Sequence, residues 1–183
     1  MASQNLEHLS DSDLASLATK DRTAFAELYE RYVDRVYTYV YYRAGNHTLT
    51  EDIVQNVFLS ALHSISRFEP RGGGFGAWLL RIAHNELIDT RRKLGHIVPV
   101  DEMPEEDMAL SAEQAALINA EAQGIMQLVD NLPDKQKELV ILKYSLGLSN
   151  KEIAGATART ETAVSSLLHR AMQRLRKEVL ATW

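Results

Sequence analysis

Apolar side chains recur along the first half of this 183-residue chain with the spacing of one helical face, and nowhere with the alternation of a β-strand. The first predicted helix follows a cap at Asp21 and stops at Gly45–Asn46. The second begins with a capping-box pattern at Thr48 and Glu51 and extends to about Arg67. Both helices are amphipathic, so we expect them to pack on each other.

A proline and three consecutive glycines interrupt the pattern in the segment RFEPRGGGF, residues 67–75. Such a segment cannot be regular secondary structure, and we predict a loop. A third amphipathic helix follows and closes near Lys93. Residues 1–93 are therefore predicted to form an N-terminal helical domain.

Residues 94–110 contain two prolines and five acidic side chains and show no sustained periodicity, so we predict an extended acidic linker. Ser111 and Gln114 then cap a helix that ends by Asn131, and Pro133 starts the next helix, which Gly147 stops. Residues 111–183 are predicted to form a second helical domain, which makes the whole chain all-α with two small domains.

The most informative stretch of the second domain is SNKEIAGATARTETAVSSLLHRAMQRLRK, residues 149–177. Ser149 and Glu152 have the spacing of a capping box, and Thr160 supplies an N-cap for a second helix about a dozen residues later. On that second helix apolar residues line one face and polar residues line another, and arginines are concentrated in the later turns. This is the pattern of a helix-turn-helix, although an ordinary helical hairpin with a solvated basic face is the alternative when the stretch is taken alone.

The charge of the chain is unevenly distributed, which makes its net value of −5 misleading. Residues 94–134 hold nine acids and no Lys or Arg, whereas residues 135–183 hold nine basic and four acidic side chains, a local charge of +5. Residues 67–93 carry six bases and three acids. Two mildly basic blocks thus flank an acidic connector, an arrangement compatible with two nucleic-acid contacts.

Several classes of function are disfavoured by what the sequence lacks. It has no cysteine, so disulfides and thiolate chemistry are excluded. We find no nucleophile elbow, metal-ligand spacing or phosphate loop, and we predict no enzyme activity, no catalytic residue, no metal and no cofactor. The polar N-terminus does not resemble a signal peptide, and no window is apolar enough to span a membrane, so we expect a cytoplasmic protein without membrane insertion.

Three blocks in series resemble the extracytoplasmic-function (ECF) group of bacterial RNA polymerase sigma factors. They are FAELYERYVDRVYTYVYYRAGNHTLTEDIVQNVFLSAL, RFEPRGGGFGAWLLRIAHNELIDTRRK, and LPDKQKELVILKYSLGLSNKEIA with SSLLHRAMQRLRK. The resemblance covers about 130 residues in the order of the family. It implies a factor that binds core RNA polymerase and directs promoter recognition, promoter melting and transcription initiation.

In the first block, the resemblance implies docking on the polymerase clamp by the acidic start of the second helix. The implied polymerase-binding residues are Glu51, Asp52, Gln55, Asn56 and Phe58. Leu49 stands where the family usually has an acid, and Asn56 where a glutamate is common, so this surface is less acidic than is usual in the family. The two acids also complement a helix N-terminus, which by itself contributes about 0.3–1 kcal/mol each.

In the second block, the resemblance implies capture of the unpaired non-template strand at the minus-ten element. A glycine-rich loop lets backbone approach a base closely, arginines track phosphates, and an aromatic ring stacks on a base. The implied residues are Arg67, Phe68, Arg71, Arg81, Asn85, Arg91 and Arg92. Phe75 is an alternative to Phe68 for stacking, although its helical phase, like that of Trp78, favours core packing. Gly76 and His84 occupy places where the family often has arginine.

In the third block, the resemblance implies reading of the duplex minus-thirty-five element by the last helix. The residues expected at base edges or phosphates are Arg159, Thr160, Thr162, Ser165, Ser166, His169, Arg170 and Arg174. Many relatives carry Lys or Arg where this chain has Ser165. The acidic linker resembles the family segment that threads the polymerase channels, and a solvated tether is the alternative.

The expected partners are core RNA polymerase, promoter DNA as duplex and as unpaired non-template strand, and an anti-sigma factor. A stand-alone helix-turn-helix regulator that binds DNA without polymerase is the rival class. Duplex binding that survives deletion of the N-terminal domain, with polymerase absent, would distinguish the rival.

Overall fold

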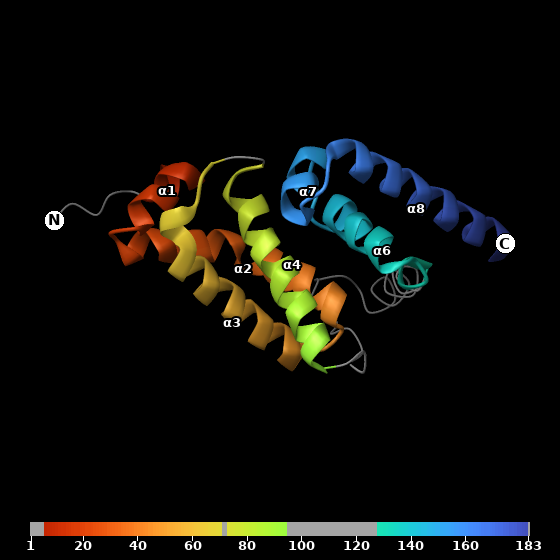
Figure 1. Ribbon diagram of the computed structural model, residues 1–183, viewed down its shortest axis with the longest axis horizontal. Helices are drawn as coiled ribbons and strands as arrows, with labels where there is room; N and C mark the ends of the chain where they lie inside the picture. The colour runs from red at the N-terminus through yellow and green to blue at the C-terminus, as the bar shows by residue number, and fades with distance from the viewer. Residues whose placement is uncertain (1–5, 71–72, 95–127, 183) are drawn as a thin grey trace, which may run out of the picture.

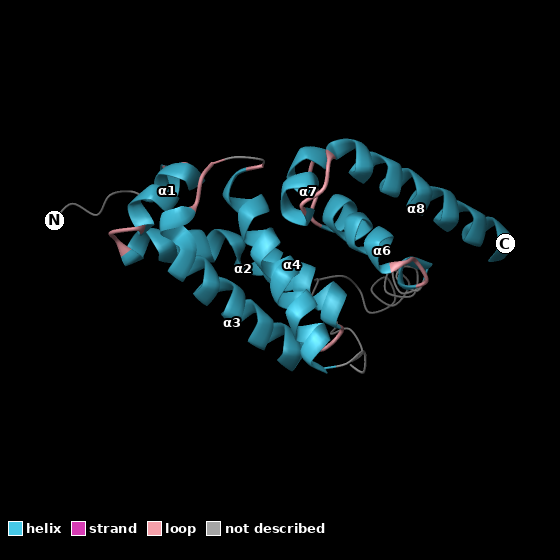
Figure 2. Ribbon diagram, in the orientation of Figure 1, coloured by secondary structure: helices cyan, strands magenta, loops and turns pink. Residues whose placement is uncertain are grey.

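The computed structural model describes residues 6–70, 73–94 and 128–182, and these residues form helices with no strand among them (Figure 2). The elements of the first half are η1 (Leu6–His8), α1 (Asp11–Ala18), α2 (Arg22–Ala44), α3 (His47–Ser64), η2 (Ile65–Arg67) and α4 (Gly74–Leu94). Those of the second half are α6 (Asp134–Val140), the π-helical turn η3 (Ile141–Ser145), α7 (Asn150–Thr157) and α8 (Glu161–Thr182). The predicted all-α fold class is confirmed.

Helix α2 begins and ends where its sequence predicts. The Asp21 carboxylate accepts a hydrogen bond from the Thr23 backbone N–H at 2.9 Å, which satisfies one of the free donors of the first turn. Gly45 ends the helix in the left-handed region, with φ of 66°, where a residue without Cβ is favoured.

The predicted capping box at the start of α3 is wrong. The cap is Asn46, whose side-chain oxygen accepts a hydrogen bond from the Leu49 N–H at 2.8 Å, so Thr48 is already inside the helix. Asn46 has extended backbone and a short polar side chain, which suits an N-cap, and it follows the glycine stop of α2 directly.

Helix α1 was not among the predicted elements. Ser10 caps it by accepting a hydrogen bond from the Asp13 N–H at 3.2 Å. Arg31 of α2 then fixes the N-terminal segment, because its guanidinium donates to the carbonyls of Leu6, Glu7 and Leu9 and pairs with the Asp11 carboxylate at 3.0 Å. Helix α1 is thereby held against α2 (Figure 1).

Helices α1 to α4, called the α1–α4 unit below, share an apolar core. Its fully buried side chains include Leu14, Leu28, Val36, Ile53, Val57, Leu79 and Ala83. A second group, the α6–α8 unit, buries Leu139, Leu142, Ile153, Val164 and Ala171. The linker 94–110 and most of the helix predicted from Ser111 to Asn131 lie outside the described residues, which resume in helical conformation at residues 128–130.

The two units pack against each other along one seam. Helix α7 lies beside α4, and η3 contacts α2 (Figure 1). Because α4 contributes one face to its own core and another to the seam, its two sides meet different surroundings. The seam therefore brings the glycine loop and α4 next to the helix-turn-helix.

Candidate nucleic-acid and partner interfaces

The helix-turn-helix has the local structure that its sequence predicts. The Ser149 hydroxyl accepts a hydrogen bond from the Glu152 N–H at 3.2 Å, while the Glu152 carboxylate accepts one from the Ser149 N–H at 2.8 Å. Ala158 turns the chain with φ of 52°, and Thr160 caps α8 by accepting from the Ala163 N–H at 3.2 Å. The hydrogen bonds to Ser149 hold the pKa of Glu152 below its usual value, which keeps the capping carboxylate ionised.

One side of α8 is open to solvent and lined by polar groups. Its apolar stripe of Val164, Leu167, Leu168, Ala171 and Leu175 faces the α6–α8 core. The predicted minus-thirty-five residues Thr160, Thr162, Ser165, Ser166, His169, Arg170 and Arg174 are all exposed, whereas Arg159 is half-buried in the turn. We call these eight residues the α8 reading face. Asn150 donates to the Ser165 hydroxyl at 2.9 Å, so α7 orients that side chain.

The predicted polymerase-binding residues divide into two groups on α3. Glu51, Asp52, Gln55 and Asn56 are exposed and share one side of the helix. Phe58 is only 6% exposed, because its ring packs at 4.6 Å, centroid to centroid, on Tyr29 of α2. The aromatic surface that α2 and α3 offer to a partner here is therefore Tyr29, which is 39% exposed, and Phe58 supports it from below.

The predicted minus-ten residues are spread over the loop and α4. Arg67, Arg81, Asn85 and Arg92 are exposed, and Arg81 and Asn85 lie one helical turn apart on the same side. Phe68 is half-buried and packs at 5.5 Å from Phe75 and 5.3 Å from Trp78. Phe75 is 2% exposed, which confirms its expected place in the core. Arg71 lies outside the described residues.

Gly76 is enclosed by Tyr32. A Cβ at this position would lie 2.8 Å from Tyr32 Cε1, which is closer than real contacts allow. Tyr32 is fixed in turn, since its hydroxyl donates to Asp11 and its ring meets Phe75 edge-on at 5.3 Å. Burial, reinforced by the neighbouring carboxylate, raises the pKa of Tyr32 and keeps the donor protonated.

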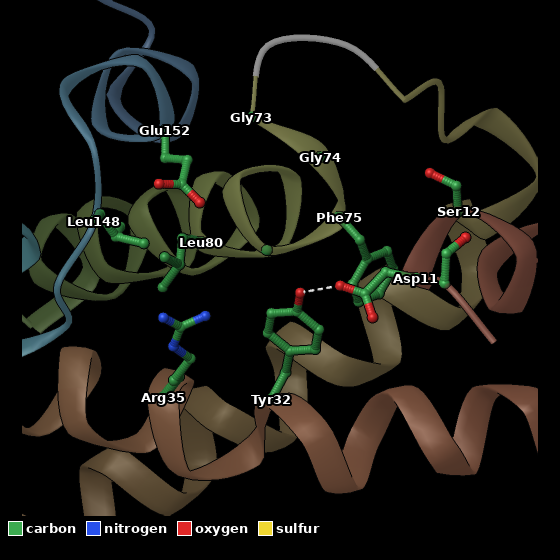
Figure 3. Close-up of a pocket in the computed structure, with 12 residues that line it drawn as sticks. Asp11, Ser12, Tyr32, Arg35, Gly73, Gly74, Phe75, Leu80, Leu148 and Glu152 are labelled. Carbon is green, nitrogen blue, oxygen red and sulfur yellow. Dashed lines mark hydrogen bonds between the residues drawn. The ribbon is translucent and has the colours of Figure 1, made fainter. Parts of the chain in front are cut away.

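A cavity of about 250 Å³ opens between the glycine loop, α1, α2 and α7 (Figure 3). Its lining combines the charged groups Asp11, Arg35 and Glu152 with the glycines at the start of α4. Gly73 approaches α7 so closely that a Cβ would lie 3.0 Å from the Glu152 Cα. The start of α7 therefore covers this side of the loop.

Deeper in the seam, a carboxylate of α6 is buried against α2 and α4. Glu138 is 2% exposed; its carboxylate accepts a hydrogen bond from the Tyr39 hydroxyl at 2.7 Å and lies 2.5 Å from His84 Nδ1. Burial opposes ionisation of Glu138, but the hydrogen bond from His84 and the charge of Arg43 outweigh it and lower the pKa of this carboxyl. Glu138 is therefore an ionised group that depends on its neighbours across the seam.

Two arginines of the α1–α4 unit complete this cluster. Arg91 donates to the Arg43 carbonyl at 2.6 Å and lies 3.4 Å from the Asp134 carboxylate, and Arg43 donates to the Asp134 carbonyl at 3.1 Å. Arg35 adds a bond to the Leu146 carbonyl at 3.2 Å. Burial lowers the pKa of Arg91, although the side chain of this predicted DNA contact is still 39% exposed.

Sequence reasoning missed the seam cluster. Tyr39 and Glu138 are 99 positions apart, and no spacing rule links them. The available signal was a carboxylate directly before the apolar run Leu139–Leu142. A buried acid of that kind needs a partner.

Together, the fold and these surfaces define a two-unit helical DNA-binding protein with a helix-turn-helix. Residues 28–97 match the Sigma-70 region 2 family and residues 122–175 match the Sigma-70 region 4 family. Among the described residues no cluster of His, Cys, Asp or Glu could hold a metal ion, and none of the described helices is long and apolar enough to cross a membrane.

The chain is similar to named sigma factors over most of its length. It is 36% identical to the ECF RNA polymerase sigma factor BldN of Streptomyces coelicolor over 163 residues, which cover 83% of this chain and 59% of BldN. It is 33% identical to SigD of Mycobacterium tuberculosis over 185 residues, covering 93% of this chain and 84% of SigD. The solved structure of CnrH shares the fold with a TM-score of 0.69 at 24% identity, covering 93% of this chain and 97% of that one.

The chain belongs to the ECF RNA polymerase sigma factors. It is thus a promoter-directing factor of RNA polymerase, a class of transcription initiation factors rather than of enzymes.

Proposed function

We propose that this sigma factor divides its work between the two units along the lines of its two family segments. Residues 1–93 bind core polymerase and the minus-ten element, residues 94–110 connect, and residues 111–183 bind the minus-thirty-five element. The observation that carries the proposal is the α8 reading face, a continuous polar surface on a capped recognition helix. A helix of this kind presents its N-terminal half to the major groove.

On the duplex element, the roles follow from side-chain chemistry. Thr162, Ser165, Ser166 and His169 offer hydrogen-bond groups to base edges, and Arg159, Arg170 and Arg174 offer charge to phosphates. Thr160 caps α8 and orients its start toward the groove. The arginines set affinity and its salt dependence, whereas the smaller polar groups set sequence preference.

On the opened element, Arg67, Arg81 and Arg92 track the phosphates of the non-template strand and Asn85 contacts a base edge. Phe68 is the aromatic group at the loop that remains partly exposed, so it is the better stacking candidate than Phe75. Arg71 belongs to this surface by its place in the sequence. Arg91 joins it once the seam opens.

For polymerase docking, we assign the exposed side of α3 formed by Glu51, Asp52, Gln55 and Asn56, with Tyr29 as its aromatic group. Charged rim residues of this kind govern association rate and specificity. Phe58 positions Tyr29 from the core. We further propose that the protein acts in the cytoplasm as a non-catalytic subunit without a cofactor.

An anti-sigma partner is also proposed. CnrH was solved in complex with the cytosolic domain of CnrY, and RpoE of Bartonella quintana, which shares the fold with a TM-score of 0.67 at 23% identity, in complex with the anti-sigma factor NepR. A partner of this kind would compete with core polymerase for the same chain.

The test is run-off transcription by core polymerase over promoter fragments from the organism's own genome, with and without this protein. New discrete transcripts are expected, and they should be lost in Glu51→Lys/Asp52→Lys but kept in Glu30→Lys/Asp34→Lys, which makes the same charge change on α2 instead of α3. Duplex binding by residues 111–183 in the absence of polymerase, with no transcript in any reaction, would instead establish the stand-alone regulator.

A further inference from the structure

Helix α1 lies beside the glycine loop and contacts the elements at both of its ends. It packs on η2, which comes before the loop, and on α4, which follows it (Figure 1). Its apolar side chains Leu14, Ala15 and Ala18 are buried in the core of the α1–α4 unit. The match to Sigma-70 region 2 begins at residue 28, so α1 lies outside that match. Its contacts nevertheless reach the loop that is proposed to capture the unpaired strand.

The first residue of α1 shares its carboxylate between two neighbouring side chains of α2. One oxygen of Asp11 accepts a hydrogen bond from Arg31 Nη1 at 3.0 Å, and the other accepts one from the Tyr32 hydroxyl (Figure 3). The same guanidinium donates to three backbone carbonyls within residues 6–9, which fixes where α1 begins. A hydrogen bond to a carboxylate is about twice as strong as one between neutral groups. Asp11 therefore holds Tyr32 in place from the side of α1.

The ring of Tyr32 in turn supports the start of α4. It leaves no room for a side chain at Gly76, because a Cβ there would lie 2.8 Å from Tyr32 Cε1. The same ring meets Phe75 edge-on at 5.3 Å, and Phe75 lies 5.5 Å from Phe68. One hydrogen bond and two ring contacts thus connect Asp11 to Phe68, the half-buried ring that is proposed to stack on a base.

These ring contacts are what orients Phe68. Three consecutive glycines precede Phe75, and glycine places few limits on the backbone of the loop. Protein interiors are packed about as densely as organic crystals, so a ring that shifts also displaces the rings that it touches. A change at the start of α1 is therefore expected to reach the exposed edge of Phe68.

We propose that Asp11 is a positioning residue for strand capture, which sets the orientation of Phe68 through Tyr32 and Phe75. Helix α1 is then a working part of the minus-ten surface, and Asp11 acts on that surface without touching DNA. The capture half of this inference rests on the function proposed for Phe68. The arrangement of the rings does not.

Trp78 reports the arrangement of the rings without DNA, because its ring lies 5.3 Å from Phe68 and 5.4 Å from Phe75. The chain has two tryptophans, so Trp183→Phe leaves Trp78 as the single fluorophore of this kind. In that background Asp11→Asn should shift the emission to longer wavelength and raise the acrylamide quenching constant, because rings that are held less firmly admit water. Unchanged fluorescence would overturn the connection between α1 and the rings.

Asp13→Asn is the matched control, since it makes the same charge change in the same first turn of α1. Asp13 is exposed, and its carboxylate accepts a hydrogen bond from Ser10 of the same segment rather than from α2. This variant should leave the fluorescence of Trp78 unchanged. All variants are compared at a temperature at which circular dichroism shows them fully folded, so that a general loss of stability does not enter the comparison.

Promoter opening by the holoenzyme tests the capture half. The probe is a promoter found by the run-off experiment above, and the reactivity of its unpaired thymines toward permanganate measures the opened fraction. The opening equilibrium should be about tenfold lower in Asp11→Asn than in Asp13→Asn, the factor that corresponds to weakening one hydrogen bond to a charged group. Binding of the minus-thirty-five duplex should be equal in the two. Equal opening in both variants would overturn the positioning role.

Tyr32→Phe removes the donor to Asp11 and keeps the ring, so it tests the path. If Asp11 acts through Tyr32, Asp11→Asn should cause no further loss of opening in the Tyr32→Phe chain. A full further loss would assign the effect to Arg31 and the segment before α1, and would overturn the path through the rings. If the unmodified chain opened no promoter while Asp11→Asn still changed the fluorescence of Trp78, the arrangement of the rings would stand and the proposed function would fail.

Discussion

The two surfaces proposed to bind DNA differ in how they are held. The α8 reading face is formed by α8 and the turn before it, fixed by a cap at Thr160 and an apolar stripe beneath it, and all its side chains except Arg159 are exposed. The surface of the glycine loop and α4 is assembled from four helices and is covered in part by α7. A surface formed by one rigid helix is already ordered in the free protein. The geometry of the loop surface, by contrast, depends on how the helices around it pack.

The difference suggests an order of events. With the proposed roles, the exposed helix α8 is accessible to duplex DNA in this arrangement, whereas the loop surface proposed for strand capture is partly covered by α7. A factor built in this way would reach the duplex element first and engage the melted element only with polymerase. Each prediction below perturbs one of the two surfaces and leaves the other as its internal reference.

The largest effect is expected at Gly76, where close packing defines the loop surface. A Cβ there would lie 2.8 Å from Tyr32 Cε1, and Asp11 and Phe75 prevent the ring from moving freely. Gly76→Ala should therefore lower the free energy of unfolding by about 1–3 kcal/mol. The higher helix propensity of alanine, about 1 kcal/mol in the opposite direction, works against that loss. Chemical denaturation measures the net change.

A double-mutant cycle identifies the cause. In a Tyr32→Leu background the further loss caused by Gly76→Ala should largely disappear, because the atom that the Cβ would meet is gone. An equal loss in both backgrounds would place the strain elsewhere in the loop. Binding of duplex DNA by the α8 reading face should be unaffected in all three variants.

A smaller effect is expected at the N-cap of α7, which belongs to the helix-turn-helix. Ser149→Ala removes an acceptor for the Glu152 N–H and a donor to its carboxylate at 2.7 Å. The loss of stability should be about 1 kcal/mol. Ser149→Thr, which keeps the hydroxyl, is the control. Amide exchange should quicken at the start of α7 while the core of α3 and α4 stays protected; uniform quickening would contradict a local cap.

Lowering the pH should weaken the contact between the two units by a smaller amount. The pKa shift of Glu138 is a net result, because burial raises this pKa and the polar neighbours lower it. Its pKa is below the ordinary 4.5 in the closed form. The stabilisation is therefore complete above about pH 4.5 and is lost as pH falls through the lower, closed-form pKa. His84, Arg43 and Tyr39 lower the pKa of Glu138, and Arg91 also interacts with its charge.

Energy transfer between dyes on Ser16→Cys of α1 and Lys177→Cys of α8, two exposed positions in a chain without other cysteines, measures this dependence from about pH 6 down to pH 3.5. Glu138→Gln should flatten the step below pH 4.5, because no carboxylate remains there to be protonated. A step of the same size in the glutamine variant would assign the acid sensitivity to another group. The exposure of the α8 reading face should not change over the range in which only the seam responds.

Sequence reasoning predicted the elements whose signals are local. The helix boundaries at Asp21, Gly45 and Ser149 rest on hydrogen bonds within three residues and on one left-handed glycine, and all three are confirmed. The start of α3 was placed two residues too late in the same reasoning, because Asn46 competes with Thr48 as a cap and has the extended backbone of an N-cap. Local sequence patterns do not decide between two candidate N-caps that lie close together in the sequence.

The parts that sequence could not give are tertiary. Tyr39 donates a hydrogen bond to the Glu138 carboxylate, which lies 99 positions away in the sequence. The periodicity of α3 placed Phe58 on the exposed side, whereas its ring is covered by Tyr29 of α2. The exposed side of α8 was readable from its periodicity, since packing of one helix on one core follows from a single stripe. The partial burial of Arg91 could not be predicted from the sequence, because it depends on where the α6–α8 unit lies.

The smallest change tests the α8 reading face by itself. Ser165 is exposed and held by a hydrogen bond from Asn150 at 2.9 Å, so its replacement disturbs no buried contact. Ser165→Arg adds a positive charge to the α8 reading face and should add about one phosphate contact. The slope of log affinity against log salt should then steepen by about 0.9. Titrations of promoter duplex at several salt concentrations measure it, with Thr182→Arg at the far end of α8 as a control of equal charge. If the two arginines strengthened binding equally, Ser165 would lie away from the groove, and the polar stripe of α8 would no longer define where DNA binds.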